Sequence, residues 1–255
     1  MEAELLPDIQ KVVRPNEHIL RRHGIALGKD ARILDFGCWS GRHTYEYLDA
    51  GYRRVVGFDI EDHVSLRQDA DHDRFHFSAP GGTYRIPFPD NHFDFIASIS
   101  VFEHVTNQAE AITEIARVLK PDGATLHVFP SRWRPIEQHI FVPFGGAIQG
   151  RRWMSLWARL GIRAGGQRNL TARQVVSSNL AFCATGIRYL DFEDIDALWR
   201  NRFASVEYAE PAFIESTRHV STVSRIMHPL IKALPGFLGL YRFAHTRVVR
   251  ARRPR

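Results

Sequence analysis

Apolar positions along the chain occur either in short unbroken runs or at helical spacing, which predicts strands alternating with helices. The run in "ARILDFG" (31–37) is ended by a glycine, and "RRVVGFDI" (53–60) is a second run of the same kind. A helix is expected between them, from about residue 42 to 50, followed by Gly51. These three segments predict one βαβ unit.

The next part of the chain repeats this pattern. "PFPDNHFDFIASIS" (87–100) is a proline and aspartate turn before a nearly continuous apolar run, as in a parallel strand covered on both faces. The segment 107–123 has Asn107 as helix N-cap, Glu110 three residues later, and Pro121 to end the helix. The strand "ATLHVFP" (124–130) follows, so we expect an α/β fold with a doubly wound sheet.

After residue 131 the pattern changes, because 132–170 holds three of the five tryptophans and no strand alternation. We interpret 132–170 as an insertion or lid over the edge of the sheet, and 1–30 as an N-terminal helical cap with Gly24 as a helix C-cap. The chain 1–255 is expected to be a single domain. Later segments are predicted as helix 171–185, strand 203–213, helix 221–234 and strand 241–253.

Composition excludes some classes of protein. Hydrophobic residues make up 44% and charged residues 24%, as in ordinary globular proteins, and no apolar run reaches the roughly 18 residues of a spanning helix. The N-terminal sequence lacks a signal-peptide pattern, so a cytoplasmic location is expected. Cys38 and Cys183 form neither a CxxC pair nor a disulfide framework, which fits a reducing compartment.

The net charge of +6 is concentrated in "RVVRARRPR" (247–255), which holds five arginines. The rest of the chain is close to neutral, so no nucleic-acid partner is expected. We interpret 247–255 as an exposed basic terminus, with contact to phosphate or anionic lipid as the alternative. The amphipathic stripe in 221–234 is expected to cover the sheet, with weak peripheral membrane contact as the alternative.

Ligands of open α/β sheets bind beyond the carboxyl ends of the strands. In "ILDFGCWSG" (33–41), Asp35, Gly37 and Gly41 occupy the first turn, and Asp59 ends the second strand 22 residues after Gly37. A carboxylate at that distance can accept both hydroxyls of a ribose. The pattern therefore predicts a ribose-bearing ligand.

The charge of the turn favours one ligand class. Asp35 would repel a pyrophosphate but suits the ammonium and sulfonium groups of S-adenosylmethionine, and the pattern is DxGxxxG, not GxGxxG. Two rival functions stay open: a Rossmann-type NAD(P)-dependent oxidoreductase, and a non-catalytic methyltransferase-like binding module. A turn whose glycines serve only packing is a further alternative.

Four segments in order carry a resemblance: "ILDFGCWSG", "VVGFDI", "IPFPDNHFDFIASISVFEHV" and "EIARVLKPDGATLHVF". Over about residues 30–131 the chain resembles the class I S-adenosylmethionine-dependent methyltransferases, small-molecule (methyltransferase type 11-like) group. The resemblance implies a Rossmann-like seven-stranded sheet with an antiparallel last strand, and S-adenosyl-L-methionine as cofactor. The cofactor-binding residues that it implies are Asp35, Gly37, Cys38, Trp39, Gly41, Asp59, Ile60, Ser98 and Ile99.

The chain departs from this family at two places. Many relatives have glycine at the position of Trp39, so a positive φ is not expected there, and the indole should point away from the cofactor or cover it. Relatives often have an acid before the "PFPD" turn, to hold the adenine amine. Here no acid precedes it, and Ser78 or a backbone amide is expected to substitute.

Methyl transfer from a sulfonium mainly requires a correct pose, but a hydroxyl acceptor gains from a base. His139, with Glu137 two residues before it, is the candidate base, and a packed histidine is the alternative. The resemblance implies that Glu103 and His104 face the methyl-transfer point. His72 and His76 are interpreted as part of a solvated loop and not as a metal pair, so no metal site is expected.

The predicted function is methyl transfer to a small-molecule or glycan-like acceptor, at oxygen. There is no NPPY-like stretch and no proline–cysteine pair, which disfavours nucleic-acid bases as acceptors. The aromatic residues of 132–170 indicate either an apolar or ring-shaped acceptor or a second small core, and the sequence leaves both open.

Overall fold

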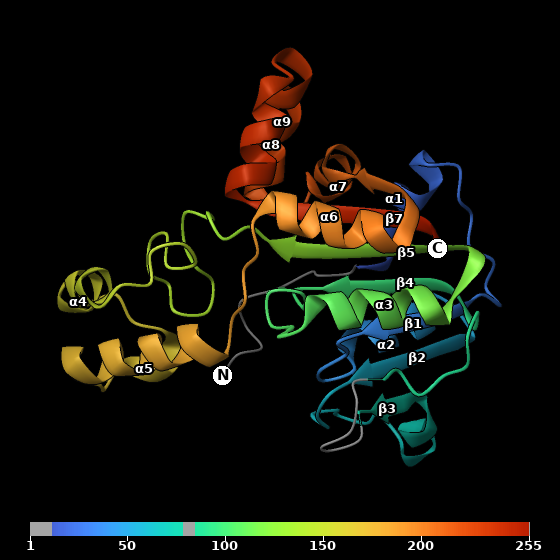
Figure 1. Ribbon diagram of the computed structural model, residues 1–255, viewed down its shortest axis with the longest axis horizontal. Helices are drawn as coiled ribbons and strands as arrows, with labels where there is room; N and C mark the ends of the chain where they lie inside the picture. The colour runs from blue at the N-terminus through green and yellow to red at the C-terminus, as the bar shows by residue number, and fades with distance from the viewer. Residues whose placement is uncertain (1–11, 79–84, 255) are drawn as a thin grey trace.

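The apolar runs form the strands of one sheet in the computed structural model, which describes residues 12–78 and 85–254 (Figure 1). The strand order is β3-β2-β1-β4-β5-β7-β6. β1 to β5 pair in parallel, and β7 runs antiparallel to both neighbours, which confirms the predicted fold class. The strands are β1 Arg32–Phe36, β2 Arg54–Asp59, β3 Phe75–Phe77, β4 Phe93–Ile99, β5 Leu119–Pro130, β6 Phe203–Tyr208 and β7 Thr246–Pro254.

Helices cover both faces of this sheet. α3 and α6 bury Ile115 and Trp199 against one face, and α1, α2 and α7 bury Ile19, Tyr47 and Ala212 against the other (Figure 1). The helices are α1 Val13–Arg22, α2 Arg42–Asp49, α3 Gln108–Val118, α4 Arg151–Arg159, α5 Ala172–Thr185, α6 Phe192–Arg202, α7 Glu210–Thr217, α8 Thr222–Ala233 and α9 Gly236–Ala244, with short 3-10 turns at Asp69–Arg74 and Gly165–Gln167. No helix within the described ranges is both long and apolar enough to cross a bilayer.

Several local predictions are confirmed. Asn107 caps α3 by accepting a hydrogen bond from the Glu110 amide, and Gly24 follows α1 with φ +71°. α2 begins at Arg42 as predicted. The part of the N-terminal cap that falls on residues 1–11 lies outside the described residues.

The prediction of an exposed basic terminus is wrong for the described part of 247–255. This segment belongs to β7, which lies between β5 and β6, and Arg247 and Arg250 are each only 3% exposed. Arg247 donates to the Leu190 carbonyl at 3.0 Å, and Arg250 pairs with Glu207. The strand accommodates arginines because their guanidinium groups reach polar partners from a buried backbone.

Two predicted strands are shorter than expected. Strand 203–213 ends at Tyr208, because α7 begins at Glu210 with Pro211 in its first turn. Strand 241–253 begins only at Thr246, because residues 241–244 close α9. Both differences arise where apolar residues fit a helix and a strand equally well.

The prediction that 221–234 covers the sheet is also wrong. α8 and α9 form a hairpin that projects from the sheet, at the top of Figure 1, and Ser224 is the buried residue of α8. Ile226, Leu234 and Phe243 are more than half exposed. α7 already occupies the place beside β7, so the hairpin has no sheet surface left to cover.

The segment after β5 builds a second, smaller core. Met154 of α4 packs with Val175 and Cys183 of α5, and Trp153 and Trp157 lie against this cluster. The small core therefore continues past residue 170 into α5, away from the sheet (Figure 1). It accounts for Trp153 and Trp157 among the aromatic residues that the sequence left open between core and acceptor site, while Phe141 and Phe144 are exposed. The lid role of 132–170 stays a prediction.

Candidate active site

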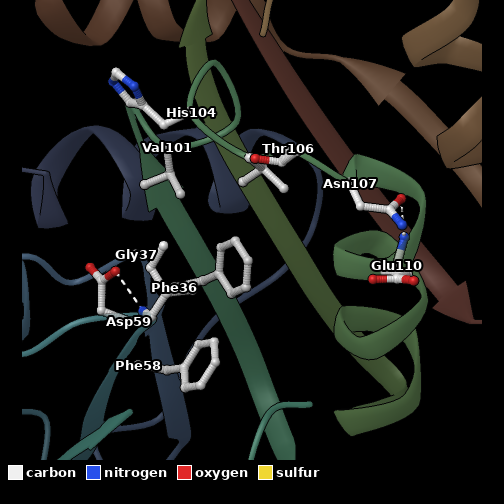
Figure 2. Close-up of a pocket in the computed structure, with 11 residues that line it drawn as sticks. Phe36, Gly37, Phe58, Asp59, Val101, His104, Thr106, Asn107 and Glu110 are labelled. Atoms are coloured by element: carbon white, nitrogen blue, oxygen red, sulfur yellow. Dashed lines mark hydrogen bonds between the residues drawn. The ribbon is translucent and has the colours of Figure 1, made fainter. Parts of the chain in front are cut away.

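A cavity of about 340 Å³ opens at the carboxyl ends of β1, β2 and β4 (Figure 2). Strand order reverses between β1 and β4, so the cavity lies at the switch point where open α/β sheets bind ligands. The residues that line it are Phe36, Gly37, Phe58, Asp59, Ile60, Val101, His104, Val105, Thr106, Asn107 and Glu110.

The glycine turn after β1 is fixed by close contacts. The amides of Gly37 and Cys38 both donate to the Phe58 carbonyl, at 2.8 and 3.1 Å, which ties the turn to the end of β2. Gly37 has φ +76°, and a Cβ there would lie 2.4 Å from a methyl carbon of Val101. Because no side chain fits at this position, the turn requires glycine on steric grounds alone.

Asp59 ends β2 at the margin of the cavity, beside Gly37 (Figure 2). One carboxylate oxygen accepts from the Trp39 amide and the other from the Ile60 amide, each at 2.7 Å. A carboxylate has about four acceptor positions, so each oxygen can accept one more hydrogen bond. This arrangement fits a ligand with two adjacent hydroxyls.

The expectation of a negative φ at Trp39 is wrong, because φ is +45° at this residue. The turn requires this left-handed conformation at residue 39 whatever the side chain. The hydrogen bond from the Trp39 amide to the Asp59 carboxylate holds the residue in this conformation. The indole also stacks on the His63 ring, with ring centroids 3.9 Å apart. The indole is 61% exposed and is not among the groups that line the cavity.

Asp35 and Cys38 lie inside the protein, outside the cavity lining. The Asp35 carboxylate accepts from the Thr44 hydroxyl at 2.8 Å, and burial raises the pKa of Asp35. The structure therefore does not place the Asp35 carboxylate in direct ionic contact with a ligand of this cavity. Gly41, with φ +76°, serves as N-cap of α2 and packs against Phe75.

Ser98 and Ile99 also lie outside the lining. The Ser98 hydroxyl is 2.7 Å from Nδ1 of His127 in the core, while Ile99 packs on the opposite face of the sheet. Of the nine predicted cofactor residues, the cavity thus collects Gly37, Asp59 and Ile60. The sequence reasoning missed Val101, Thr106 and their neighbours, although their place directly after the β4 run was a usable signal.

The three predicted catalytic residues do come together. Glu103 and His104 follow β4, and His139 comes from the segment after β5, yet one ligand atom of each lies within 4.8 Å of the others. The His104 and His139 rings meet edge to face, with centroids 4.8 Å apart. His104 also lines the cavity, so the cluster adjoins the predicted cofactor position.

His139 is oriented by Glu137. Nδ1 of His139 donates to the Glu137 carboxylate at 2.7 Å, which leaves the lone pair of Nε2 free. Glu137 is buried and also accepts from the Ile140 amide and the Tyr189 hydroxyl. Burial acts to raise the pKa of Glu137, but hydrogen bonds, first from His139, hold it below the usual value.

Glu103 is 1% exposed, and its Oε2 has no hydrogen-bond partner among the described residues. Burial raises the pKa of Glu103 to about 7. His104 donates from Nδ1 to the Gly186 carbonyl at 2.5 Å, and its Nε2 lies 4.0 Å from Glu103. Burial lowers the pKa of His104, which favours the neutral imidazole.

A second cavity, of about 610 Å³, lies on the other side of His104. His104 and Thr106 line both cavities, so the two are neighbours. The lining of the second cavity includes the polar side chains of Arg132, Gln149 and Arg188. Of the cluster Glu103, His104 and His139, it is His104 that lines both the cavity at the sheet and the larger polar one.

Comparison with known proteins finds a similarity to methyltransferases in the sheet portion of the chain. Residues 34–126 match the family model of a methyltransferase domain. A sterol 24-C-methyltransferase of Gibberella zeae is 29% identical over 119 residues, which cover 44% of this chain and 31% of that protein. A probable S-adenosylmethionine-dependent methyltransferase of Mycolicibacterium smegmatis is 31% identical over 118 residues, covering 44% and 45%. The chain spans less than half the length of these relatives.

Solved structures agree on the fold. Two structures of phosphoethanolamine N-methyltransferase 2 from Haemonchus contortus, one of them with S-adenosyl-L-methionine, align with TM-scores of 0.51 and 0.50 at 16% identity. Each alignment covers 94% of this chain and 53% of the other. The resemblance to class I methyltransferases is confirmed, and with it S-adenosylmethionine as the cofactor of the family.

Proposed function

Because residues 34–126 match the family model of a methyltransferase domain, we propose that the protein transfers a methyl group from S-adenosylmethionine to oxygen of a small-molecule or glycan-like acceptor. The observation that carries this proposal is the cavity at the switch point, which is closed by the Gly37 turn and ends at Asp59. The backbone of Gly37 lines one side of the cavity, and the Asp59 carboxylate, which can accept from two adjacent hydroxyls, lines the other. The match to the family model makes the oxidoreductase alternative unnecessary.

In this proposal the ribose hydroxyls bind the free acceptor positions of Asp59, and the adenine lies against Ile60. The methionine part lies along the Gly37 turn, above Val101. The Ser78 amide already donates to the Asp59 carbonyl at 3.0 Å, so the Ser78 hydroxyl remains as the group for the adenine amine. Residues 79–84, which follow it, are outside the described residues.

The acceptor occupies the larger cavity, and its hydroxyl approaches the cluster from that side. Nε2 of His139 takes the hydroxyl proton while Glu137 holds the ring in place. The oxygen attacks the methyl carbon, the carbon–sulfur bond breaks, and its electron pair stays on sulfur. The polar side chains that line this cavity, among them Arg132, Gln149 and Arg188, support a hydroxylated acceptor over an apolar one.

Calorimetric titration with S-adenosylmethionine, S-adenosylhomocysteine and NAD tests the cofactor site. We expect binding of the first two only, and Asp59→Ala should weaken it by about 1–3 kcal/mol through lost charge-assisted hydrogen bonds. Glu61→Ala is the matched control, because it removes an exposed carboxylate two residues away. Equal affinities of Asp59→Ala and the wild type would place the ribose elsewhere. Binding without turnover on any hydroxylated acceptor would favour the non-catalytic module.

We further propose that the α8–α9 hairpin contacts an anionic membrane surface. Ile226, Leu234 and Phe243 expose apolar side chains on a projecting element, and Arg225 and Lys232 of α8 are basic. Co-sedimentation with phosphatidylglycerol vesicles tests this contact, with phosphatidylcholine vesicles as control. Ile226→Asp should abolish the sedimentation, and equal sedimentation of this variant would disprove the contact. The cytoplasmic location stays a prediction.

A further inference from the structure

The side-chain cluster around His104, the residue that lines both cavities, has the composition of a metal site. Glu103, His104 and His139 each present one ligand atom, and these atoms lie within 4.8 Å of one another. One carboxylate with two imidazoles is a ligand set that suits first-row transition ions. We infer that these three residues form a binding site for a divalent transition-metal ion, for which Zn²⁺ is the reference.

A second observation points to the same ligand. Oε2 of Glu103 is buried and has no hydrogen-bond partner within the described parts of the chain, whereas Oε1 accepts a long hydrogen bond from Gln138 at 3.4 Å and lies 4.0 Å from Nε2 of His104. A buried carboxylate without a partner is costly, and protein structures normally satisfy it or neutralise it. A cation between Glu103 and the two imidazoles would neutralise the buried carboxylate.

Both imidazoles are already oriented for coordination. His104 uses Nδ1 to donate to the Gly186 carbonyl, and His139 uses Nδ1 to donate to Glu137. In each ring the remaining nitrogen, Nε2, therefore carries a lone pair. Metal-bound histidines almost always have such an outer carbonyl or carboxylate partner, which fixes the ring and raises its basicity. Glu137 is thus a positioning residue for the site.

The distances require a small closure. Zn–N bonds of about 2.1 Å with tetrahedral angles place ligand atoms about 3.4 Å apart, compared with the 4.8 Å limit observed here. The side chains of His104 and His139 are 37% and 27% exposed, so small shifts of the two residues together with their Nδ1 partners can close the gap. The nitrogen ligands select Zn²⁺, Co²⁺ or Ni²⁺ over Mg²⁺, which prefers oxygen.

The consequence for the reaction rests on the proposed function. Nε2 of His139 cannot coordinate an ion and accept a proton at the same time. Glu103, His104 and His139 would hold the ion, which would supply Lewis-acid polarisation of the acceptor hydroxyl, and the hydroxyl proton would then pass to water instead of His139. Attack on the methyl carbon and departure of S-adenosylhomocysteine are unchanged.

Metal binding is measured on the full chain after dialysis against a chelator. Calorimetric titration should give one Zn²⁺ per chain at this site and no comparable binding of Mg²⁺. His139→Ala and Glu103→Gln should each weaken Zn²⁺ binding by at least about tenfold, as should the positioning variant Glu137→Gln. His76→Ala is the matched control, because it removes a partly buried histidine far from the cluster in sequence.

Co²⁺ absorption gives a readout that does not depend on stability. The wild type should show visible bands of low-symmetry Co²⁺, and His139→Ala should lose them while keeping its circular dichroism spectrum. Failure of the wild type to bind Zn²⁺, or Zn²⁺ affinities of His139→Ala and Glu103→Gln equal to the wild type, would overturn the inference. Zn²⁺ binding without S-adenosylmethionine binding would instead keep the metal site and overturn the proposed function.

Discussion

Two histidine networks, one buried in the core and one partly exposed at the cavities, differ in how their polar groups find hydrogen-bond partners. In the core, both ring nitrogens of His127 have partners: Nδ1 is bonded to Ser98 and Nε2 to Thr125. Among the described residues, His104 and His139 have hydrogen-bond partners only on Nδ1. Each polar side chain of the His127 network is hydrogen-bonded to another protein group. In the second network, Nε2 of each histidine accepts no hydrogen bond from the described residues.

The difference teaches which polar network is structural. Thr125 donates to the Ile96 carbonyl at 3.1 Å, so its oxygen accepts from Nε2 of His127, and the Ser98 hydroxyl donates to Nδ1. Nothing in this network is available to a ligand. A buried group without a partner, such as Glu103, costs stability and persists where it serves binding or catalysis.

The strongest test of this comparison is a pair of alanine variants. His127→Ala removes a fully buried ring that packs on Phe102 and Trp199, and it leaves two hydroxyls without their partner. We expect it to lower the free energy of unfolding by about 3 kcal/mol, as measured in urea with chelator present. His139→Ala should lower it by less than about 1 kcal/mol. Equal losses would remove the distinction between the two networks.

Acid should affect the core network next. Burial lowers the pKa of His127 to about 3, below its value in the unfolded chain. The unfolded state therefore binds the proton first, so this stabilisation is complete above about pH 6.5 and is lost as the pH falls toward 3, by about 1.4 kcal/mol per unit. Urea unfolding at pH 7, 6 and 5 measures the slope. His127→Gln should show a shallower slope, and a slope identical to the wild type would contradict the assignment.

A smaller effect is expected at Ser98. Ser98→Ala leaves Nδ1 of His127 without a donor and should lower the free energy of unfolding by about 1–2 kcal/mol. Because the hydroxyl faces the core, S-adenosylmethionine affinity should not change. A loss of affinity comparable to that of Asp59→Ala would return Ser98 to the cofactor site.

The smallest effect has the opposite sign. Glu103→Gln removes an uncompensated buried charge while keeping the shape of the side chain, so at pH 8 in chelator it should raise the free energy of unfolding by about 0.5–1 kcal/mol. Urea unfolding beside the wild type measures it. A clear destabilisation would mean that the Glu103 carboxylate is satisfied in the protein without metal.

Local patterns predicted the sheet portion well. The glycine-ended run at 31–37, the acid at Asp59 and the cap at Asn107 depend on neighbours close in sequence, and the structure has each of them in place. Even the antiparallel order of the last strand followed from the family resemblance. The spacing of apolar residues, and the residues that cap or end each segment, were enough to predict this portion because parallel strands and their helices obey local rules.

Tertiary contacts decide what the sequence could not predict. Orientation of His139 depends on Glu137 and Tyr189, and that of His104 on Gly186, about 80 residues away in the chain. The amphipathic pattern of α8 records an apolar face but does not say what covers it. Positive φ at Trp39 follows from the turn geometry, which overrides the preference of the side chain.

The position of β7 has a consequence for biosynthesis. β6 pairs only with β7 in the described sheet, and β7 is inserted between β5 and β6 although it follows both in the chain. During translation, the edge of β5 that pairs with β7 therefore stays unpaired while more than a hundred further residues are synthesised. Such an unpaired edge is prone to pair with other chains. Nascent protein is thus expected to depend on chaperones until its last strand has been translated.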